Sequence, residues 1–183
     1  MSYCQFVAGP GAETVHAPYH NFEYGFPSSD EVVLFERLVL EINQAGLSWE
    51  TILKKREGFR AAYDGFDPEK VAAYGEEDRA RLLADAGIIR NRLKVEAAIF
   101  NAGVIVGMRS SDGGFANWID QRHPLAKEEW VKEFKRTFRF TGGEIVNEFL
   151  MSLGYLPGAH EPECAVFQTI AALNPPWMVS TRL

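Results

Sequence analysis

The sequence lacks the features of several protein classes. It has no apolar run that approaches the length of a membrane span, no low-complexity tract and no internal repeat. Sustained alternation of apolar and polar residues, the signature of β-strands, is also missing. The 183 residues are 46% apolar and 13% aromatic, which suits a globular protein. We therefore expect a largely helical protein and treat residues 1–183 as a single domain.

Cysteine is scarce, with only Cys4 and Cys164. The start of the chain, MSYCQFVAGPGAE, has neither the basic nor the apolar region of a signal peptide. We therefore expect a cytoplasmic protein, with no membrane partner. In a reducing compartment the two cysteines are expected to be thiols or metal ligands rather than a disulfide.

Positive charge is in short supply, because the formal net charge is −6. This is an objection to nucleic-acid binding, although such binding needs local rather than total positive charge. The locally basic segments are residues 54–60, 90–94 and 132–139. In the third, glutamates interleave with the cations, so an exposed mixed-charge helix is the preferred interpretation there.

Apolar periodicity and capping residues predict an all-α fold. The first 27 residues are expected to be irregular because of their prolines and glycines. Capping boxes are expected to begin at Ser28 and Thr141. Asp67, followed by proline, is expected to cap a third helix. The predicted helices cover residues 30–45, 48–62, 67–74, 76–86, 91–108, 115–119, 127–139, 141–154 and 165–173.

The central stretch of the sequence is EINQAGLSWETILKKR, residues 41–56. Glu41 falls on the apolar face of a helix that Gly46 is expected to end, and Ser48 can cap a second helix that begins with Trp49. A carboxylate, a flat ring and nearby cations are what a nucleobase pocket needs. The alternative is structural: Glu41 pairs with Arg37, one turn earlier, and Trp49 belongs to the core.

The segment 76–108 predicts two helices joined by a turn at Gly87. Such a hairpin can present backbone N–H groups to a phosphate, and Arg90, Arg92 and Lys94 lie beside it. Helical hairpins with glycine turns are common, so this motif alone is a weak indication of DNA binding.

Four residues have the chemistry of a zinc site. His160 and Cys164 are spaced i, i+4, and Cys4 and His20 lie at the other end of the chain. A shared metal would hold the two ends together. From spacing alone, two unrelated thiols and scattered histidines are the preferred interpretation, and His16 is a rival ligand.

These residues together resemble the DNA-3-methyladenine glycosylase I family. The similarity is dense over residues 1–103, thin over 104–140 and looser over 138–164. The runs that carry it, besides Cys4 and the His160–Cys164 pair, are YHNFEYG at 19–25, LEINQAGLSW at 40–49, ILKKRE at 52–57, FDP at 66–68 and GIIRNR at 87–92.

The resemblance implies an all-α helix-hairpin-helix glycosylase fold with a structural zinc that joins the N- and C-terminal segments. It also implies a monofunctional enzyme that flips 3-methyladenine out of double-stranded DNA and hydrolyses its glycosidic bond. We expect a monomer that acts on DNA with alkylated bases and releases 3-methyladenine. The family lacks the catalytic aspartate of most helix-hairpin-helix glycosylases, and no lysine nucleophile is implied.

The resemblance also assigns roles to residues. Glu41 is implied to be the catalytic group that contacts the base. The implied zinc ligands are Cys4, His20, His160 and Cys164. The implied base pocket contains Tyr19, Tyr24, Glu41 and Trp49. The implied DNA contacts are Gly46, Leu47, Lys54, Gly87, Arg90, Arg92 and Lys94.

The sequence departs from the family pattern at several places. Asn21 stands where the family has aspartate, Phe6 and Tyr24 stand where it has tryptophan, and Gly143-Glu144 replace part of a late FVGPTT run. Glu144 could bring a second carboxylate near the site. Three alternatives follow: a glycosylase with altered base specificity, a non-catalytic DNA-binding module, and, from the net charge, a protein that has lost DNA binding.

Overall fold

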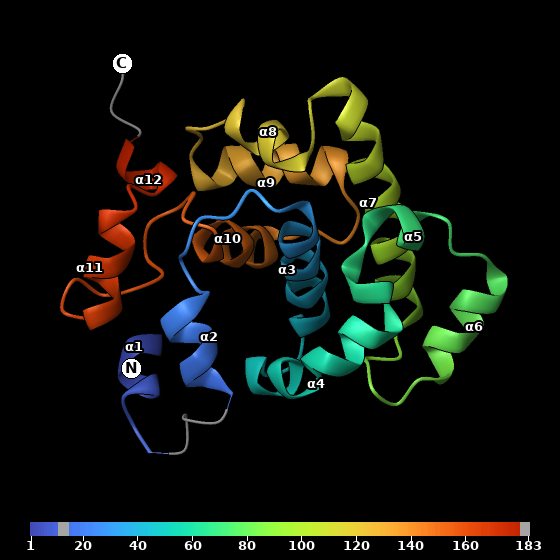
Figure 1. Ribbon diagram of the computed structural model, residues 1–183, viewed down its shortest axis with the longest axis horizontal. Helices are drawn as coiled ribbons and strands as arrows, with labels where there is room; N and C mark the ends of the chain where they lie inside the picture. The colour runs from blue at the N-terminus through green and yellow to red at the C-terminus, as the bar shows by residue number, and fades with distance from the viewer. Residues whose placement is uncertain (11–14, 180–183) are drawn as a thin grey trace.

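The structure is a computed structural model that describes residues 1–10 and 15–179. Helices make up all of its regular secondary structure, and the described residues contain no strand (Figure 1). The elements are α1 (Tyr3–Val7), α2 (His16–Phe22), α3 (Glu31–Gln44), α4 (Trp49–Ala62), the 3-10 helix η1 (Asp64–Phe66), α5 (Pro68–Ala72), α6 (Glu76–Ala84), α7 (Arg92–Ser111), α8 (Phe115–Asp120), α9 (Lys127–Thr137), α10 (Gly143–Ser152), α11 (Ala165–Ala172) and α12 (Pro176–Val179).

Helix α3 lies in the middle of the molecule (Figure 1). It packs against α4, α7, α8 and α10, and Leu34, Leu38 and Ile42 along it are fully buried. Because other helices surround it, even polar residues of α3 are buried, and Glu41 and Asn43 are among them. The central helix therefore carries a carboxylate into the interior.

Two of the predicted N-caps, those at Ser48 and Asp67, are confirmed. The Ser48 hydroxyl accepts a hydrogen bond from the Thr51 N–H, and the Asp67 carboxylate accepts one from the Glu69 N–H. The two predicted capping boxes are wrong. Asp30, not Ser28, caps α3. The Thr141 hydroxyl donates to the carbonyl oxygen of Phe138 and does not cap α10.

The N-terminal segment is more helical than expected, since α1 and α2 form there; residues 11–14 lie outside the described part. The two helices lie on the same side of the molecule as α11 (Figure 1). The Gly25 N–H donates to the carbonyl oxygen of Ser152 at 2.8 Å, and a ring N–H of His160 donates to that of Tyr24 at 2.7 Å. The first and last parts of the chain therefore hold each other in place.

A bilayer-spanning helix would need a long apolar stretch, and none of the helices in residues 1–10 and 15–179 has one.

Candidate active site and metal centre

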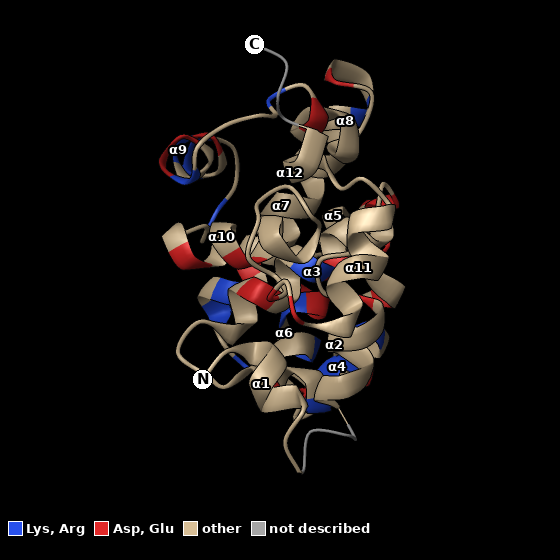
Figure 2. Cartoon of the chain, turned by 90° about the vertical axis from the view of Figure 1, so that its left-hand side faces the viewer, with Lys and Arg blue, Asp and Glu red and all other residues tan. Residues whose placement is uncertain are grey.

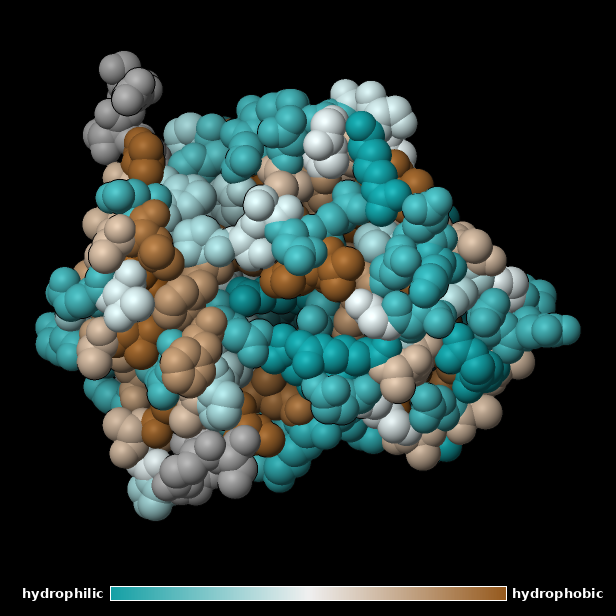
Figure 3. Space-filling model, in the orientation of Figure 1, coloured by the Kyte–Doolittle hydropathy of each residue, from teal (hydrophilic) through white to brown (hydrophobic). Residues whose placement is uncertain are grey.

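A cavity of about 480 Å³ opens between α2, α3, α4 and α10. In Figure 3, which has the orientation of Figure 1, a hollow lies near the middle of the visible face, with hydrophilic residues at its back and apolar residues at its rim. This volume lies within the usual range for a small-molecule site, roughly 300–1,000 Å³. The residues that line it are Tyr3, Tyr19, Tyr24, Glu41, Gln44, Trp49, Glu144 and Glu148.

Glu41 reaches this cavity from α3, and its side chain is 5% exposed. The pKa of its carboxyl is raised to about 8, mainly by burial and also by the nearby Glu148, while Arg37 acts in the opposite direction. Arg37, the predicted pairing partner, instead donates to the carbonyl of Ser152 and lies 4.0 Å from a Glu23 oxygen. In the described part of the chain no side chain donates a hydrogen bond to Glu41. Its oxygens are therefore available to a ligand.

Aromatic side chains form the walls of the cavity. Tyr19 and Trp49 meet edge to face with ring centroids 5.2 Å apart, and Tyr19 and Tyr24 lie 5.6 Å apart. Trp49 is placed at the first position of α4 by the Ser48 cap, at the corner that follows α3. Such walls suit a flat ring, which stacks on aromatic faces. Tyr19, Tyr24, Glu41 and Trp49, predicted from the sequence as base-binding, thus line one cavity.

Two further carboxylates line the cavity from α10. The Tyr24 hydroxyl donates to Glu148 Oε2 at 2.9 Å, and burial is the main cause that raises the pKa of the Glu148 carboxyl. Glu144 is exposed and lies 3.2 Å from the Lys127 ammonium. The sequence suggested Glu144, but not Glu148. A pair of glutamates spaced i, i+4 is ordinary on a solvated helix, so no local signal marks Glu148.

Tyr3 and Gln44 were also missed. Tyr3 directly precedes Cys4, and its ring meets that of Tyr24 edge to face at 5.6 Å. If Cys4 is anchored near His20, its neighbour is carried to the same region. The proximity of Tyr3 to a predicted metal ligand was therefore the available signal.

Lys94 is the clearest correction among the predicted DNA contacts. Its side chain is buried, and its ammonium donates to the carbonyl oxygens of Asn43 and Ala45, each at 2.8 Å. These are carbonyls at the end of α3, where backbone acceptors lack helical partners. Lys94 therefore holds the corner between α3 and α4 instead of facing a phosphate.

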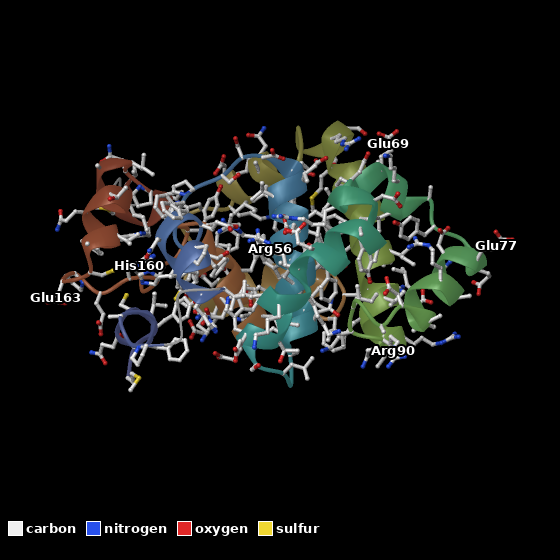
Figure 4. The ribbon with its side chains drawn as sticks, turned by 60° about the horizontal axis from the view of Figure 1, so that its bottom comes forward. Arg56, Glu69, Glu77, Arg90, His160 and Glu163 are labelled. Atoms are coloured by element: carbon white, nitrogen blue, oxygen red, sulfur yellow. The ribbon has the colours of Figure 1, made fainter. Side chains whose placement is uncertain are left out.

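The basic run at 54–56 is largely used inside the protein. Lys54 pairs with Glu50 at 2.7 Å, and Lys55 donates to the carbonyl of Ala86 at 2.7 Å. Arg56 lies near the middle of the view in Figure 4 and is partly buried, and its guanidinium binds Glu23 in a bidentate manner at 2.6 Å and Glu36 at 2.7 Å. Of the three, only Lys54 remains well exposed.

The remaining predicted DNA contacts lie at the surface. Arg90 and Arg92 are exposed, and Figure 4 shows Arg90 at the periphery of the molecule, beside the turn between α6 and α7. Gly46 and Leu47 are exposed at the corner after α3. Gly46 has φ +82°, a conformation that favours glycine.

Gly87 has a packing role in the turn between α6 and α7. A Cβ placed on Gly58 of α4 would lie 2.5 Å from the Gly87 carbonyl oxygen, so the two backbones approach closely. The Gly87 N–H donates to Asp85 Oδ1 at 2.7 Å. This turn is therefore fixed against α4, which also carries Trp49.

The four predicted metal ligands lie together. The donor atoms of Cys4, His20, His160 and Cys164 all lie within 4.8 Å of one another. The four sulfur–nitrogen distances are 3.4, 3.7, 3.7 and 3.8 Å. A tetrahedral zinc with bonds of about 2.3 Å to sulfur and about 2.0 Å to nitrogen sets these distances to roughly 3.5 Å. The rival His16 instead contacts the Tyr3 hydroxyl through Nδ1 at 3.1 Å.

Hydrogen bonds around the cluster also fit a metal site. The second ring nitrogen of His20 lies 2.7 Å from Asn21 Oδ1, and that of His160 lies 2.7 Å from the Tyr24 carbonyl oxygen. Each acceptor fixes a tautomer whose free nitrogen faces the two sulfurs, as is usual for zinc-bound histidine. Asn21 therefore lies beside the ligand cluster and does not line the cavity.

The fold and the cavity define an all-helical protein that can take up a flat ring between aromatic side chains and carboxylates. The chain belongs to the methyladenine glycosylase family, because the family model for methyladenine glycosylases matches residues 10–134. DNA-3-methyladenine glycosylase 1 of Escherichia coli (strain K12) is 36% identical over 186 residues, covering 91% of this chain and 97% of that protein. DNA-3-methyladenine glycosylase of Haemophilus influenzae is 35% identical, covering 84% of this chain and 93% of its own.

The chain is also similar to solved structures of 3-methyladenine DNA glycosylase I. A variant of 3-methyladenine DNA glycosylase I in complex with 3-methyladenine has a TM-score of 0.79 at 30% identity, covering 91% of this chain and 97% of its own. The Staphylococcus aureus enzyme, solved to explain 3-methyladenine recognition, has a TM-score of 0.75 at 31% identity, covering 84% and 92%. The predicted all-α fold and family are therefore confirmed.

Proposed function

We propose that this protein excises 3-methyladenine from alkylated DNA in base excision repair. The observation that carries the proposal is the buried carboxylate of Glu41 in a cavity walled by Tyr19, Tyr24 and Trp49. The named functions of the relatives, DNA-3-methyladenine glycosylases at 35–36% identity, support the same substrate.

The proposed chemistry relies on the lesion. Methylation at N3 places a positive charge on adenine, so the base is already a good leaving group and needs no strong acid. The enzyme flips the nucleotide out of the helix, stacks the ring on aromatic side chains and offers Glu41 as an acceptor for the amino group. Water then attacks the sugar carbon through an oxocarbenium-like state, and the base departs with the electrons of the glycosidic bond. Within the described part of the chain no lysine lines the cavity, which supports hydrolysis without strand cleavage.

We propose a structural zinc held by Cys4, His20, His160 and Cys164. The sulfur–nitrogen distances and the two histidine hydrogen bonds support it. The ion would supply folding free energy only, by holding α1 and α2 against the C-terminal segment. Tyr3 is in α1, Tyr19 is in α2, and Tyr24 follows shortly after α2.

The DNA contacts are also part of the proposal. Arg90 and Arg92 would meet phosphates beside the α6–α7 turn, which we interpret as a helix-hairpin-helix element. Leu47 would enter the gap left by the flipped base. We further propose one domain that acts as a monomer, in the cytoplasm.

The test is the release of free 3-methyladenine from methylated duplex DNA, measured by chromatography. We expect release by the wild type and a loss of roughly tenfold or more for Glu41→Gln, which keeps the size of the side chain but cannot ionise beside a cationic base. Salt-sensitive DNA binding without base release would instead indicate a non-catalytic module. Failure to bind DNA at low salt would indicate a protein that has lost this substrate.

A further inference from the structure

Glu148 lies in the same cavity as Glu41, and nothing in the proposed chemistry yet uses it. It reaches the cavity from α10, one turn after Glu144. Figure 2 marks the acidic residues of α10 in red. The side chain is partly buried, so its carboxylate has lost some of its hydration.

Tyr24 holds this carboxylate in place. The buried Tyr24 hydroxyl donates to Glu148 Oε2 at 2.9 Å, and the Tyr24 ring is itself fixed by edge or tilted contacts with Tyr3 and Tyr19. The tyrosine hydroxyl at position 24 is the group that contacts Glu148. The side chain at this position thus orients that of another residue in the cavity.

The charges around the cavity are unbalanced. Glu41, Glu144 and Glu148 line it, and none of the lysines and arginines that the structure describes does. Glu144 is exposed and paired with Lys127, and Arg37 lies behind Glu41, where it binds Ser152 and Glu23. The charge of Glu148 disfavours the charged form of Glu41, and the charge of Glu144 disfavours that of Glu148. A cation that enters the cavity relieves this repulsion, whereas a neutral ring does not.

We propose that Glu148 is a second anionic acceptor for the flipped base and makes binding in this cavity depend on a positive charge on the ring. The inference rests on the proposed glycosylase function and extends it. The ligand class is an alkylated purine with a fixed positive charge and an exocyclic amino group. Glu148 is then a specificity-determining residue, because it discriminates a charged lesion from an undamaged neutral purine.

The test compares a cationic and a neutral probe. 3,9-Dimethyladenine carries a fixed positive charge at neutral pH, and 9-methyladenine is neutral and of similar size. Binding of each is measured by quenching of tryptophan fluorescence for the wild type, Glu148→Gln and Glu128→Gln. The glutamine at position 148 keeps an oxygen that accepts from Tyr24. The variant at 128 is the control, since it removes an exposed carboxylate on α9 that does not line the cavity.

We expect Glu148→Gln to weaken binding of the cationic probe about tenfold, as for a lost charged hydrogen bond, and to change binding of the neutral probe less than about twofold. Glu128→Gln should change both by less than about twofold. The proposal is overturned if Glu148→Gln weakens binding of both probes equally, since that result indicates a structural effect. It is also overturned if the variant weakens binding of neither probe. A wild type that binds neither probe also overturns it.

The same variants separate this inference from the proposed function. If the wild type releases no base but the probe preference depends on Glu148, the glycosylase function fails and the cation site remains. If the wild type releases base and Glu148→Gln has unchanged release and binding, only the role of Glu148 fails.

Discussion

The ammonium of Lys94 lies 2.8 Å from the carbonyl oxygen of Ala45, and this contact joins the start of α7 to the corner that precedes Trp49. The corner therefore depends on a cation that the sequence pattern assigned to DNA. Lys94→Met keeps the apolar stem but removes the donor. We expect a loss of about 1–3 kcal/mol in unfolding free energy, measured by urea denaturation, because one buried and one partly buried carbonyl lose a partner. Lys70→Met, an exposed change, should cost less than about 0.5 kcal/mol.

Arg90 and Lys94 should differ in their effect on DNA affinity. The exposed Arg90 can neutralise a phosphate, whereas the buried Lys94 cannot. We expect Arg90→Ala to reduce the slope of log K against log salt by about 0.9, whereas Lys94→Met leaves the slope unchanged. Titration of labelled duplex DNA at several salt concentrations measures both. An equal slope change for the two variants contradicts the assignment of Lys94 to the interior.

Glu41 should make stability depend on pH. Its carboxyl has a pKa of about 8 in the folded protein, against about 4.3 in an unfolded chain. Between these values the folded state holds a proton that the unfolded chain has released, so the contribution of this residue to stability falls as pH rises through the window. Glu41→Gln does not titrate. Its melting temperature should exceed that of the wild type by roughly 3–10 °C at about pH 9 and by little at about pH 4.

The control for this pH effect is Glu144→Gln, whose carboxylate is exposed. Its melting temperature should follow that of the wild type at both pH values. A difference between Glu41→Gln and wild type that does not grow with pH would show that Glu41 is not buried as described.

Trp49 should contribute to the affinity for 3-methyladenine through its aromatic ring. We expect Trp49→Leu to weaken binding of free 3-methyladenine by roughly tenfold, since stacking on an aromatic side chain is worth about 1–3 kcal/mol per base. Trp49→Phe keeps a ring at the same place and should lose less. Equal losses for the two variants would assign the effect to packing against Tyr19 instead. Calorimetric titration of each variant gives the affinities.

Asn21 should act on the metal rather than on the base. Because its side-chain oxygen faces a ring nitrogen of His20, we expect Asn21→Leu to lower zinc affinity roughly 10–100-fold. Asn21→Asp keeps the acceptor and should retain the affinity. Competition with a chromogenic chelator measures it, and base release at saturating zinc should be the same for both. If the wild type holds no zinc after purification, the metal proposal fails for the whole cluster.

The sequence predicted the features that depend on local chemistry. Helix α3 ends and helix α4 begins within about two residues of the predicted positions, because Gly46 and Ser48 act on their immediate neighbours. Helices α1 and α2 were missed because they are short and held by contacts across the chain, such as that between His160 and Tyr24. No local pattern contains that information.

The sequence also did not predict the direction in which a long side chain points. Arg56 and Lys94 both lie in basic runs, and both are turned inward, toward Glu23 and toward the end of α3 respectively. Glu148 is the opposite case: its place in the sequence suggested an ordinary glutamate on a solvated helix, yet its side chain lines the cavity. The residues of the cavity could be predicted where family resemblance added to the local pattern, as for Glu41 and Trp49.

The contact between His160 and Tyr24 has a consequence for the order in which the protein is completed. The chain is synthesised from its N-terminus, so Tyr19 and Tyr24 leave the ribosome long before the histidine that secures them. A nascent chain that stops before residue 160 lacks the imidazole that binds the Tyr24 carbonyl oxygen, so this wall of the cavity is without one of its supports until that residue has been added.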